Sequence, residues 1–318
     1  MSAVTYREAG QFLKDHDGYL ILTHKRPDGD AVGCAVALCL ALRKLGKTAW
    51  VLHNPDATTL FAPYWGDTVA PEGYVPQTVV SVDLASEGLF FRDEECWKGK
   101  VDLCIDHHGS NEGYAKLTCV EPDKAACGEI LYNMIREWFP VEADIALPLY
   151  VAVATDTGCF MYSNTTPHTH RVAADLMSAG IDFRTVNQRH FRTKSVTRLR
   201  VESRMIETLA LHDQGAIALA AISLADVAEL GAREEDLEDI AGFIGQLAGV
   251  RTAVTIRELR PGECKLSVRT GPELNASDVC AILGGGGHPA AAGCTVHGTV
   301  QDARDAIMKA IRTVQNEG

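Results

Sequence analysis

The chain has 318 residues, of which 46% are hydrophobic and 23% are charged, and these fractions exclude a chain that is mainly disordered. The length favours two domains over one very large domain. A formal net charge of -12 argues against a protein that grips long nucleic acid over a broad face, since that mode needs a basic surface, but it allows a small anionic substrate in a local pocket.

Two features of the sequence bear on location. Charged residues at Arg7, Glu8, Lys14 and Asp15 precede any long apolar run, which is not how a secretory signal is built. The longest apolar stretch, Ala31 to Leu42, is shorter than the about 20 residues that a membrane-spanning helix needs. None of the ten cysteines forms a Cys-x-x-Cys pair, which argues against a zinc-cysteine site or a disulfide framework. We therefore expect a cytoplasmic protein with no membrane partner.

Short apolar runs alternate with helical patterns through the first part of the chain. The strand-like runs span residues 19–22, 49–52, 79–82 and 101–105, and the helical patterns span about 30–45, 125–138, 145–153 and 168–178. This alternation predicts an α/β domain over residues 1–185, with a parallel sheet and helices on both faces.

A basic segment follows, with seven basic residues against one acid, Glu202, between Arg184 and Arg204. It predicts a basic helical connector over residues 186–212 that faces something anionic, although for a charge run taken alone a solvated helix face is the favoured explanation. The remainder, 213–318, predicts a smaller α/β domain. Its expected elements are a strand at 217–222, a helix at about 234–247, a hairpin at 252–269 and a last helix from about 301.

The segment from His24 to Asp30 lies between a predicted strand and a predicted helix. His24 ends the strand, and Asp28 and Asp30 follow in a turn shaped by Pro27 and Gly29. Imidazole and carboxylate together suit manganese, zinc or iron, whereas carboxylates alone suit magnesium. A structural role is also open, with Asp30 as the N-cap of the following helix and Asp28 as a turn residue.

Further carboxylates and imidazoles follow other apolar runs. Asp83 follows a strand-like run, although a lone aspartate there is more often a cap. Asp106, His107 and His108 follow the next run, where burial costs free energy unless the groups are paired or bind a metal. Asp156 ends an otherwise apolar helical stretch. Since ligands of open α/β sheets bind at the carboxyl ends of the strands, we expect these residues to converge at one edge.

This arrangement resembles the DHH phosphoesterases, which are named for the Asp-His-His that this chain carries at 106–108, and the resemblance covers almost all of the sequence. It implies two divalent metal ions that share one bridging aspartate, with manganese favoured and magnesium as the alternative. Carried onto this chain, the first ion would be held by His24, Asp28 and Asp83, and the second by Asp30, Asp83, His107 and Asp156, with Asp83 as the bridge.

The same resemblance leaves His108 free of a metal-binding role. We expect His108 to contact a non-bridging phosphate oxygen or to protonate the leaving group, with a structural histidine as the alternative. Asp106 is expected to fix the imidazole of a neighbour, so both residues are assigned to catalysis. Cys34 stands where relatives commonly have a small hydroxyl residue, and we expect it to affect packing more than chemistry. Asn111 and the segment Ser163 to Pro167 also resemble family positions, with roles that the sequence does not define.

A glycine run in the second domain resembles the Gly-Gly-Gly-His…Ala-Ala-Gly element of the DHH-associated substrate-binding domain. Gly285, Gly286 and Gly287 would let backbone N–H groups approach a phosphate, and His288 adds a donor. Arg269 resembles the arginine that such domains direct at the substrate phosphate. A glycine run alone is often only a flexible loop, so its meaning here depends on the DHH motif.

The chain's size and its glycine-rich second domain are similar to the bacterial branch of the family that acts as oligoribonuclease and 3′-phosphoadenosine 5′-phosphate (pAp) phosphatase. The resemblance implies hydrolysis of very short RNA, linear dinucleotides or pAp, with no long nucleic acid as partner. A cyclic-dinucleotide phosphodiesterase is the main enzymatic alternative, and an inorganic pyrophosphatase is disfavoured by the Gly-Gly-Gly-His element. A catalytically silent nucleotide-binding protein on the same scaffold is the alternative from another class. A homodimer is left open.

Overall fold

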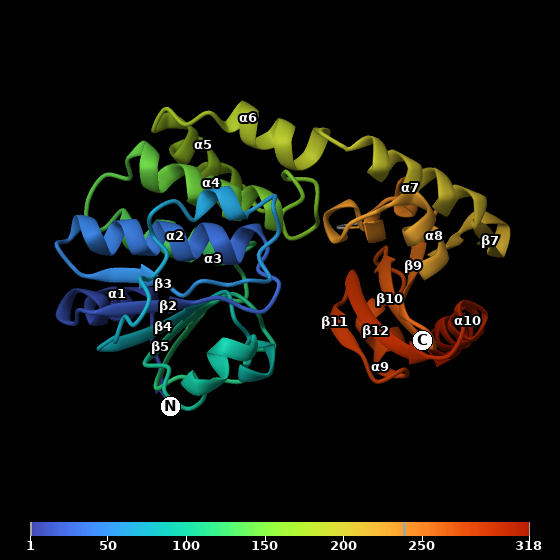
Figure 1. Cartoon of the computed structure of the whole chain (residues 1–318), viewed down its shortest axis with the longest axis horizontal. Helices are drawn as coiled ribbons and strands as arrows, with labels where there is room; N and C mark the ends of the chain where they lie inside the picture. Colours follow the sequence, from blue (N-terminus) through green and yellow to red (C-terminus); the bar gives the residue numbers. More distant parts are fainter. Residues whose placement is uncertain (1, 238–239, 318) are drawn as a thin grey trace. The chain divides into compact units, whose positions relative to one another are not determined.

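The computed structural model describes residues 2–237 and 240–317. The chain divides between Thr193 and Lys194 into two compact units, each of which is described by itself (Figure 1). Among the helices of the described residues, none combines the length and the apolar character that a membrane span requires. Both units are built from a sheet with helices packed on it, so the predicted α/β class is confirmed.

The first unit is built on a six-stranded sheet in which every pairing is parallel. Its strands, in spatial order, are β1 (Ser2–Ala3), β6 (Leu117–Val120), β5 (Leu103–Asp106), β4 (Thr78–Val82), β2 (Tyr19–Leu22) and β3 (Ala49–Val51). The order along the chain changes direction between β2 and β4, because β3 lies outside β2 whereas β5 and β6 lie outside β4. Such a reversal is where open α/β sheets bind their ligands.

Alternate side chains of the strands go to two different cores, as a strand of period two requires. Tyr19 and Ile21 of β2 join a core with the long helices, whereas Leu20 and Leu22 join a core formed with the segment after β4. The helices on the first side are α1 (Tyr6–Asp15), α2 (Gly29–Lys44), α3 (Cys127–Ile135), α4 (Ala143–Asp156) and α5 (Pro167–Ser178). The other side is covered by loops and two short 3-10 helices, Glu87–Leu89 and Arg92–Trp97.

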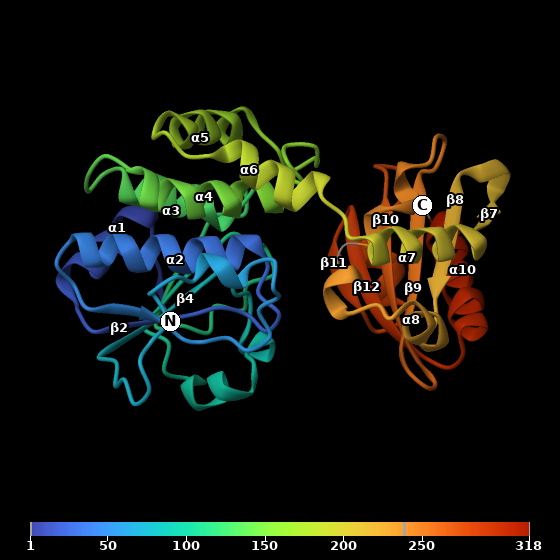
Figure 2. The ribbon, with the colours of Figure 1, turned by 45° about the horizontal axis from the view of Figure 1, so that its top comes forward.

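Helix α2 is buried on nearly all sides, which agrees with its continuous apolar composition. It lies beside α4, as two views of the unit show (Figures 1 and 2). Gly33 makes the close approach between them, because a Cβ at this position would lie 2.3 Å from the carbonyl oxygen of Pro148. The packing of α2 on α4 fixes the start of α2 and the end of α4, where predicted metal ligands lie.

The segment that the sequence assigned to a basic connector is divided between the units. Helix α6 (Phe183–Asn187) and a π-helical turn, Gln188–Arg192, end the first unit. Helix α7 (Val196–Glu207) belongs to the second unit, where Val201 and Met205 enter the core. Two of the basic residues, Lys194 and Arg198, pair with Glu202 at 2.8 and 2.9 Å.

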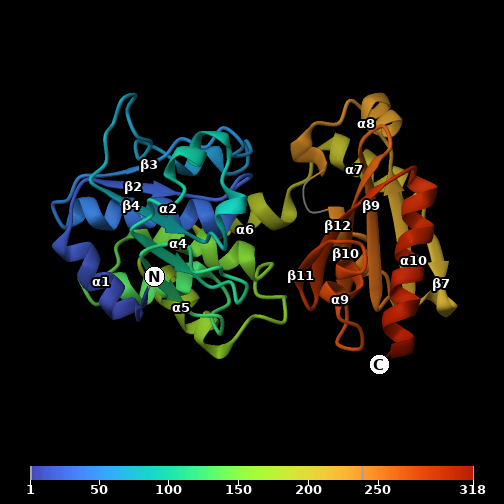
Figure 3. The ribbon, with the colours of Figure 1, turned by 90° about the horizontal axis from the view of Figure 1, so that it is seen from below.

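The second unit contains a mixed six-stranded sheet. Its strands, in spatial order, are β11 (Gly286–His288), β12 (Ala291–His297), β10 (Glu263–Thr270), β9 (Thr252–Arg260), β8 (Ile217–Ile222) and β7 (Ala210–His212). Only the pairing of β8 with β9 is parallel among these strands. One face packs on α9 (Ala276–Ala281) and α10 (Val300–Glu317), and Figure 3 shows α10 beside the sheet. The other face packs on α7 and on the segment after α8 (Leu224–Leu230).

The prediction of one helix at about 234–247 is wrong. The structure has three short 3-10 helices there, Glu234–Leu237, Ile240–Gly242 and Ile244–Gln246, and residues 238 and 239 lie outside the described part. Leu237, Ile240 and Ile244 are buried at spacings of three and four residues, which an α-helix and successive 3-10 turns share. Two glycines within this stretch lower the helical propensity that would have favoured one continuous helix.

Candidate metal centre

A first group of predicted ligands lies beyond the end of β2. The Nε2 atom of His24 is 3.8 Å from Oδ1 of Asp28 and 3.8 Å from Oδ2 of Asp83. Asp28 is the N-cap of α2, since its Oδ1 accepts hydrogen bonds from the amides of Asp30 and Ala31. The structural alternative therefore applies to Asp28 rather than to Asp30, and the capping role coexists with a place in this group.

A second group surrounds the imidazole of His107, directly after β5. Its Nε2 atom lies 3.8 Å from Oδ2 of Asp30, 3.5 Å from Oδ1 of Asp83 and 3.6 Å from Oδ2 of Asp156. Asp30 is in the first turn of α2 and Asp156 is the last residue of α4. Segments far apart in sequence thus bring one imidazole and three carboxylates together.

Asp83 belongs to both groups, because Oδ2 faces His24 and Oδ1 faces His107. It follows β4 with a φ of 53°, in the left-handed region that residues other than glycine adopt infrequently and aspartate adopts more readily than most. Its side chain is 2% exposed, and Oδ1 has no hydrogen-bond partner. Burial raises the pKa of Asp83 well above its ordinary value, and the charges of Asp30 and Asp28 add to this effect.

The two imidazoles are oriented as metal-binding histidines commonly are. Nδ1 of His24 lies 2.9 Å from the carbonyl oxygen of Lys25, and Nδ1 of His107 lies 3.2 Å from that of Lys124. A carbonyl oxygen only accepts, so each Nδ1 carries a proton and Nε2 points toward the carboxylates. Burial alone would lower the pKa of His24, but the hydrogen bond and charge of Asp28 outweigh it and raise the pKa to about 9.

These groups fit two divalent cations. Each of the two groups contains one imidazole nitrogen and at least two carboxylate oxygens, a donor set suited to divalent ions such as manganese, zinc or iron. The partnerless oxygen of Asp83 is the observation that tests the fit, because a buried carboxylate oxygen without a donor requires a cation or a proton.

His108 and Asp106 form a hydrogen-bonded pair next to the second group. Nδ1 of His108 lies 2.7 Å from Oδ1 of Asp106, while Oδ2 of Asp106 accepts a 2.6 Å hydrogen bond from the side-chain amide of Asn111. Asp106 is fully buried, and its contact with Nδ1 fixes the orientation of the His108 ring. His108 Nδ1 is also 3.6 Å from Oδ1 of Asp83, so this imidazole lies beside the shared carboxylate.

Donors that the sequence did not suggest hold the Asp30 carboxylate. The amide of Cys127 donates to Oδ2 at 2.7 Å, and the amide of Gly128 and the thiol of Cys34 donate to Oδ1 at 3.0 and 3.1 Å. The expectation that Cys34 affects packing more than chemistry therefore omitted a direct contact with a predicted ligand. The two amides open α3, about 100 residues along the chain, and no local sequence signal links them to Asp30.

Asn164, from the segment that resembled a family position, supports the end of α4. Its side-chain amide donates to the carbonyl oxygens of Asp156 and Ala125, each at 3.0 Å. It thereby joins the residue that ends α4 to the segment that precedes α3.

In the second unit, the predicted phosphate-binding residues lie in register across three strands. Arg269 of β10 and His288 of β11 are both paired with Ala291 of β12, and directly opposed residues project from the same face of a sheet. The glycine run, for which a flexible loop was the alternative explanation, is partly a strand, since Gly286 and Gly287 belong to β11, and all three residues of this strand are exposed. The backbone of this edge strand is therefore accessible.

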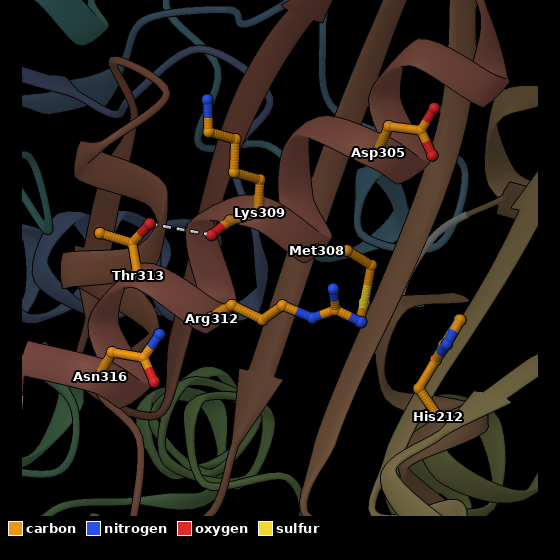
Figure 4. A pocket seen from close by; sticks show the side chains of 7 residues that line it. All are labelled: His212, Asp305, Met308, Lys309, Arg312, Thr313 and Asn316. Carbon is orange, nitrogen blue, oxygen red and sulfur yellow. Dashed lines mark hydrogen bonds between the residues drawn. The ribbon is translucent and has the colours of Figure 1, made fainter.

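A separate groove of about 400 Å³ lies on the second unit between α10 and β7 (Figure 4). Its lining includes His212, Lys309 and Arg312 with the acidic Asp305. None of the predicted site residues is part of this lining. The groove therefore gives no support to the assignment of Arg269 or His288.

Comparison with known proteins agrees with the geometry. The chain matches the model described as "DHH family, N-terminal domain" over residues 19–181 and the DHHA1 domain over residues 216–317. It is 34% identical, over 96% of this chain and 93% of the relative, to "Bifunctional oligoribonuclease and PAP phosphatase NrnA" from Thermus thermophilus.

Two solved structures show the same fold. One, titled an exopolyphosphatase-related protein from Bacteroides fragilis, has a TM-score of 0.86 at 19% identity and covers 98% of this chain and 96% of that one. The other, RecJ from Thermus thermophilus in complex with Mn²⁺, has a TM-score of 0.52 at 12% identity and covers 98% of this chain and 55% of that one. With both domains matched and a relative that is similar over nearly the whole chain, the chain belongs to the DHH family.

Proposed function

We propose that this protein is a metal-dependent phosphoesterase that hydrolyses short oligoribonucleotides, including linear dinucleotides, and pAp. The observation that carries the proposal is the division of the two Asp83 oxygens between the two ligand groups. A carboxylate shared in this way is what a pair of adjacent cations needs, and paired cations are a recurrent solution for displacement at phosphorus.

The metal assignment extends to all six predicted ligands. His24 and Asp28 would hold one ion and Asp30, His107 and Asp156 the other, with Asp83 shared; manganese is favoured by the mixed imidazole and carboxylate donors, and magnesium is the alternative. Bound divalent ions supply Lewis-acid stabilisation of the phosphoryl oxygens and make water more acidic.

The remaining residues bind and orient the substrate. His108, held at Nδ1 by Asp106, has Nε2 as the atom that contacts a phosphate oxygen or passes a proton to the leaving group. Arg269 would bind a terminal phosphate through its planar fork, and His288 with the exposed amides of β11 would add donors. An acidic chain of this kind suits a short substrate bound at a few basic groups.

The substrate class is supported by the extent of the similarity. The relative named as an oligoribonuclease and PAP phosphatase matches both units and nearly the whole chain. All six predicted ligands lie in the two groups, which disfavours a catalytically silent nucleotide-binding protein. We place the enzyme in the cytoplasm, as the sequence led us to expect.

One comparison of turnover tests the proposal. The purified chain with Mn²⁺ would be assayed on pAp, a linear dinucleotide, a 24-residue RNA and a cyclic dinucleotide. We expect rapid release of phosphate from pAp or of mononucleotides from the dinucleotide, with slow cleavage of the long RNA. Preference for the cyclic dinucleotide would replace the substrate assignment with the main alternative. Failure on all four would reject the phosphoesterase function.

A further inference from the structure

Cys34 lies one helical turn after the predicted ligand Asp30, on the same face of α2. The thiol is 3.1 Å from Oδ1 of Asp30, and both side chains are almost completely buried. Residues four apart on a helix are neighbours, so the contact follows directly from the sequence spacing. A carboxylate only accepts, and the thiol is therefore the donor.

Two backbone amides complete the set of donors around Asp30. Oδ1 accepts from the Cys34 thiol and from the amide of Gly128 at 3.0 Å, while Oδ2 accepts from the amide of Cys127 at 2.7 Å. Each carboxylate oxygen has room for about two donors or ligands. Oδ1 thus has its full set of donors, whereas Oδ2 can accept one more donor or bind a cation. Oδ2 is also the oxygen that faces His107, at 3.8 Å from its Nε2 atom.

We propose that Cys34 is a positioning residue for metal binding: its thiol occupies Oδ1 of Asp30, so that the carboxylate presents Oδ2 alone to the ion held with His107 and Asp156. The inference rests on the proposed metal-dependent function and deepens it. Without the thiol, Oδ1 keeps only the amide of Gly128 as a donor, and the orientation of the carboxylate toward its partners is less restrained. Groups that hydrogen-bond to metal ligands commonly change metal affinity by about 10–100-fold when they are removed.

The same helix provides a matched control. Cys39 is five residues further along α2, is also fully buried, and donates its thiol to the carbonyl oxygen of Ala49 at 3.2 Å. This hydrogen bond involves none of the predicted metal ligands. Removing the Cys39 thiol therefore reproduces the loss of a buried sulfur from α2 without loosening Asp30.

The experiment measures Mn²⁺ binding to the full chain by isothermal titration calorimetry, without substrate, for the wild type and for Cys34→Ala, Cys34→Ser and Cys39→Ala. We expect Cys34→Ala to weaken one of two binding events by about 10–100-fold. Cys34→Ser restores a donor and should stay within about threefold of the wild type, and Cys39→Ala should leave both events unchanged.

The outcomes separate this inference from the proposed function. The role of Cys34 would be overturned if Cys34→Ala bound both ions with wild-type affinity, or if Cys39→Ala weakened binding as much as Cys34→Ala. The proposed function would still stand in either case, provided that the wild type binds two ions and cleaves the dinucleotide. A wild type that binds no Mn²⁺ would reject both. If Cys34→Ala does not fold, the decision falls to Cys34→Ser: binding weakened tenfold despite a folded, donor-bearing side chain would contradict the inference.

Discussion

The two candidate sites of this chain differ in burial and in the groups that form them. In the first unit, the candidate site is made of side chains around a buried centre, where Asp30 and Asp83 are 1% and 2% exposed, whereas Asp28 lies at its exposed margin. In the second unit, the candidate site combines the side chains of Arg269 and His288 with the backbone of a glycine-containing edge strand, and β11 is exposed throughout. The contrast teaches that charge governs the first site and steric freedom the second, so different substitutions should disable them.

The largest effect should come from the shared carboxylate. We expect Asp83→Asn to reduce turnover by roughly 10³-fold, about 4 kcal/mol of transition-state stabilisation, because both ligand groups lose part of their charge. The metal-free variant should be at least as stable as the wild type, since Asp83 is buried among other carboxylates. Steady-state kinetics and thermal unfolding check the two effects. Asp123→Asn, at an exposed carboxylate paired with Lys124, is the control.

The second prediction concerns metal and pH together. Burial lowers the pKa of His107, but the charges of Asp30 and Asp156 outweigh it, so that His107 and His24 both have a pKa of about 9 instead of 6.5. The folded metal-free chain holds protons that the unfolded chain releases between pH 6.5 and 9, and its stability should fall as pH rises through this range.

Manganese should reverse that loss, because an ion bound only by the folded chain at 100 times its Kd stabilises it by about 2.7 kcal/mol. Denaturant unfolding at pH 6.5 and pH 9, with EDTA and with Mn²⁺, measures both effects. A metal-free stability that rises with pH in this window would contradict the assigned environment of the two histidines.

A third prediction concerns the second site, where added volume should matter more than charge. A Cβ at Gly285 would lie 2.2 Å from the carbonyl oxygen of Gly293, whereas a Cβ at Gly286 meets nothing within 4 Å. Gly285→Ala should lower the free energy of unfolding by about 1–3 kcal/mol, and Gly286→Ala should change it by less than about 0.5 kcal/mol. Urea unfolding of the full chain checks this pair, and equal effects would show that Gly285 is not held against Gly293 of β12 as described.

The smallest effect is expected at Arg269. Arg269→Ala should raise KM for pAp by about tenfold with little change in kcat, which corresponds to about 1.4 kcal/mol, close to the lower end of what a lost hydrogen bond to a charged group costs. Arg260→Ala, on the same hairpin and paired with Glu263 at 2.6 Å, should leave KM unchanged. An unchanged KM in Arg269→Ala would remove this arginine from the substrate site.

The sequence predicted the features that depend on local pattern. His24, Asp83 and His107 follow apolar runs that form neighbouring parallel strands, so alternation and strand ends were enough to bring them together. The predicted helix at 234–247 failed because buried residues three and four apart fit more than one kind of helix.

Other features depend on contacts that no local pattern encodes. The amides of Cys127 and Gly128 reach Asp30 only after α3 packs beside α2. Because nearly every residue has a backbone amide, such donors cannot be recognised from the residue type. The positive φ of Asp83 could not be predicted from the sequence either, because an aspartate does not by itself indicate a left-handed backbone conformation. These are the contacts that orient the predicted ligands, and they follow from tertiary structure.

The reversal of strand order between β2 and β4 has a consequence for how the chain folds. Residues 24 and 83 become neighbours only when two strands separated by the whole of α2 and β3 pair, and Asp156 joins them only when α4 packs. Pairings of such long sequence separation form late and slowly. Uptake of the second ion would therefore report that the segments from α2 to the end of α4 have assembled, and chains folded only in part would lack a complete metal site.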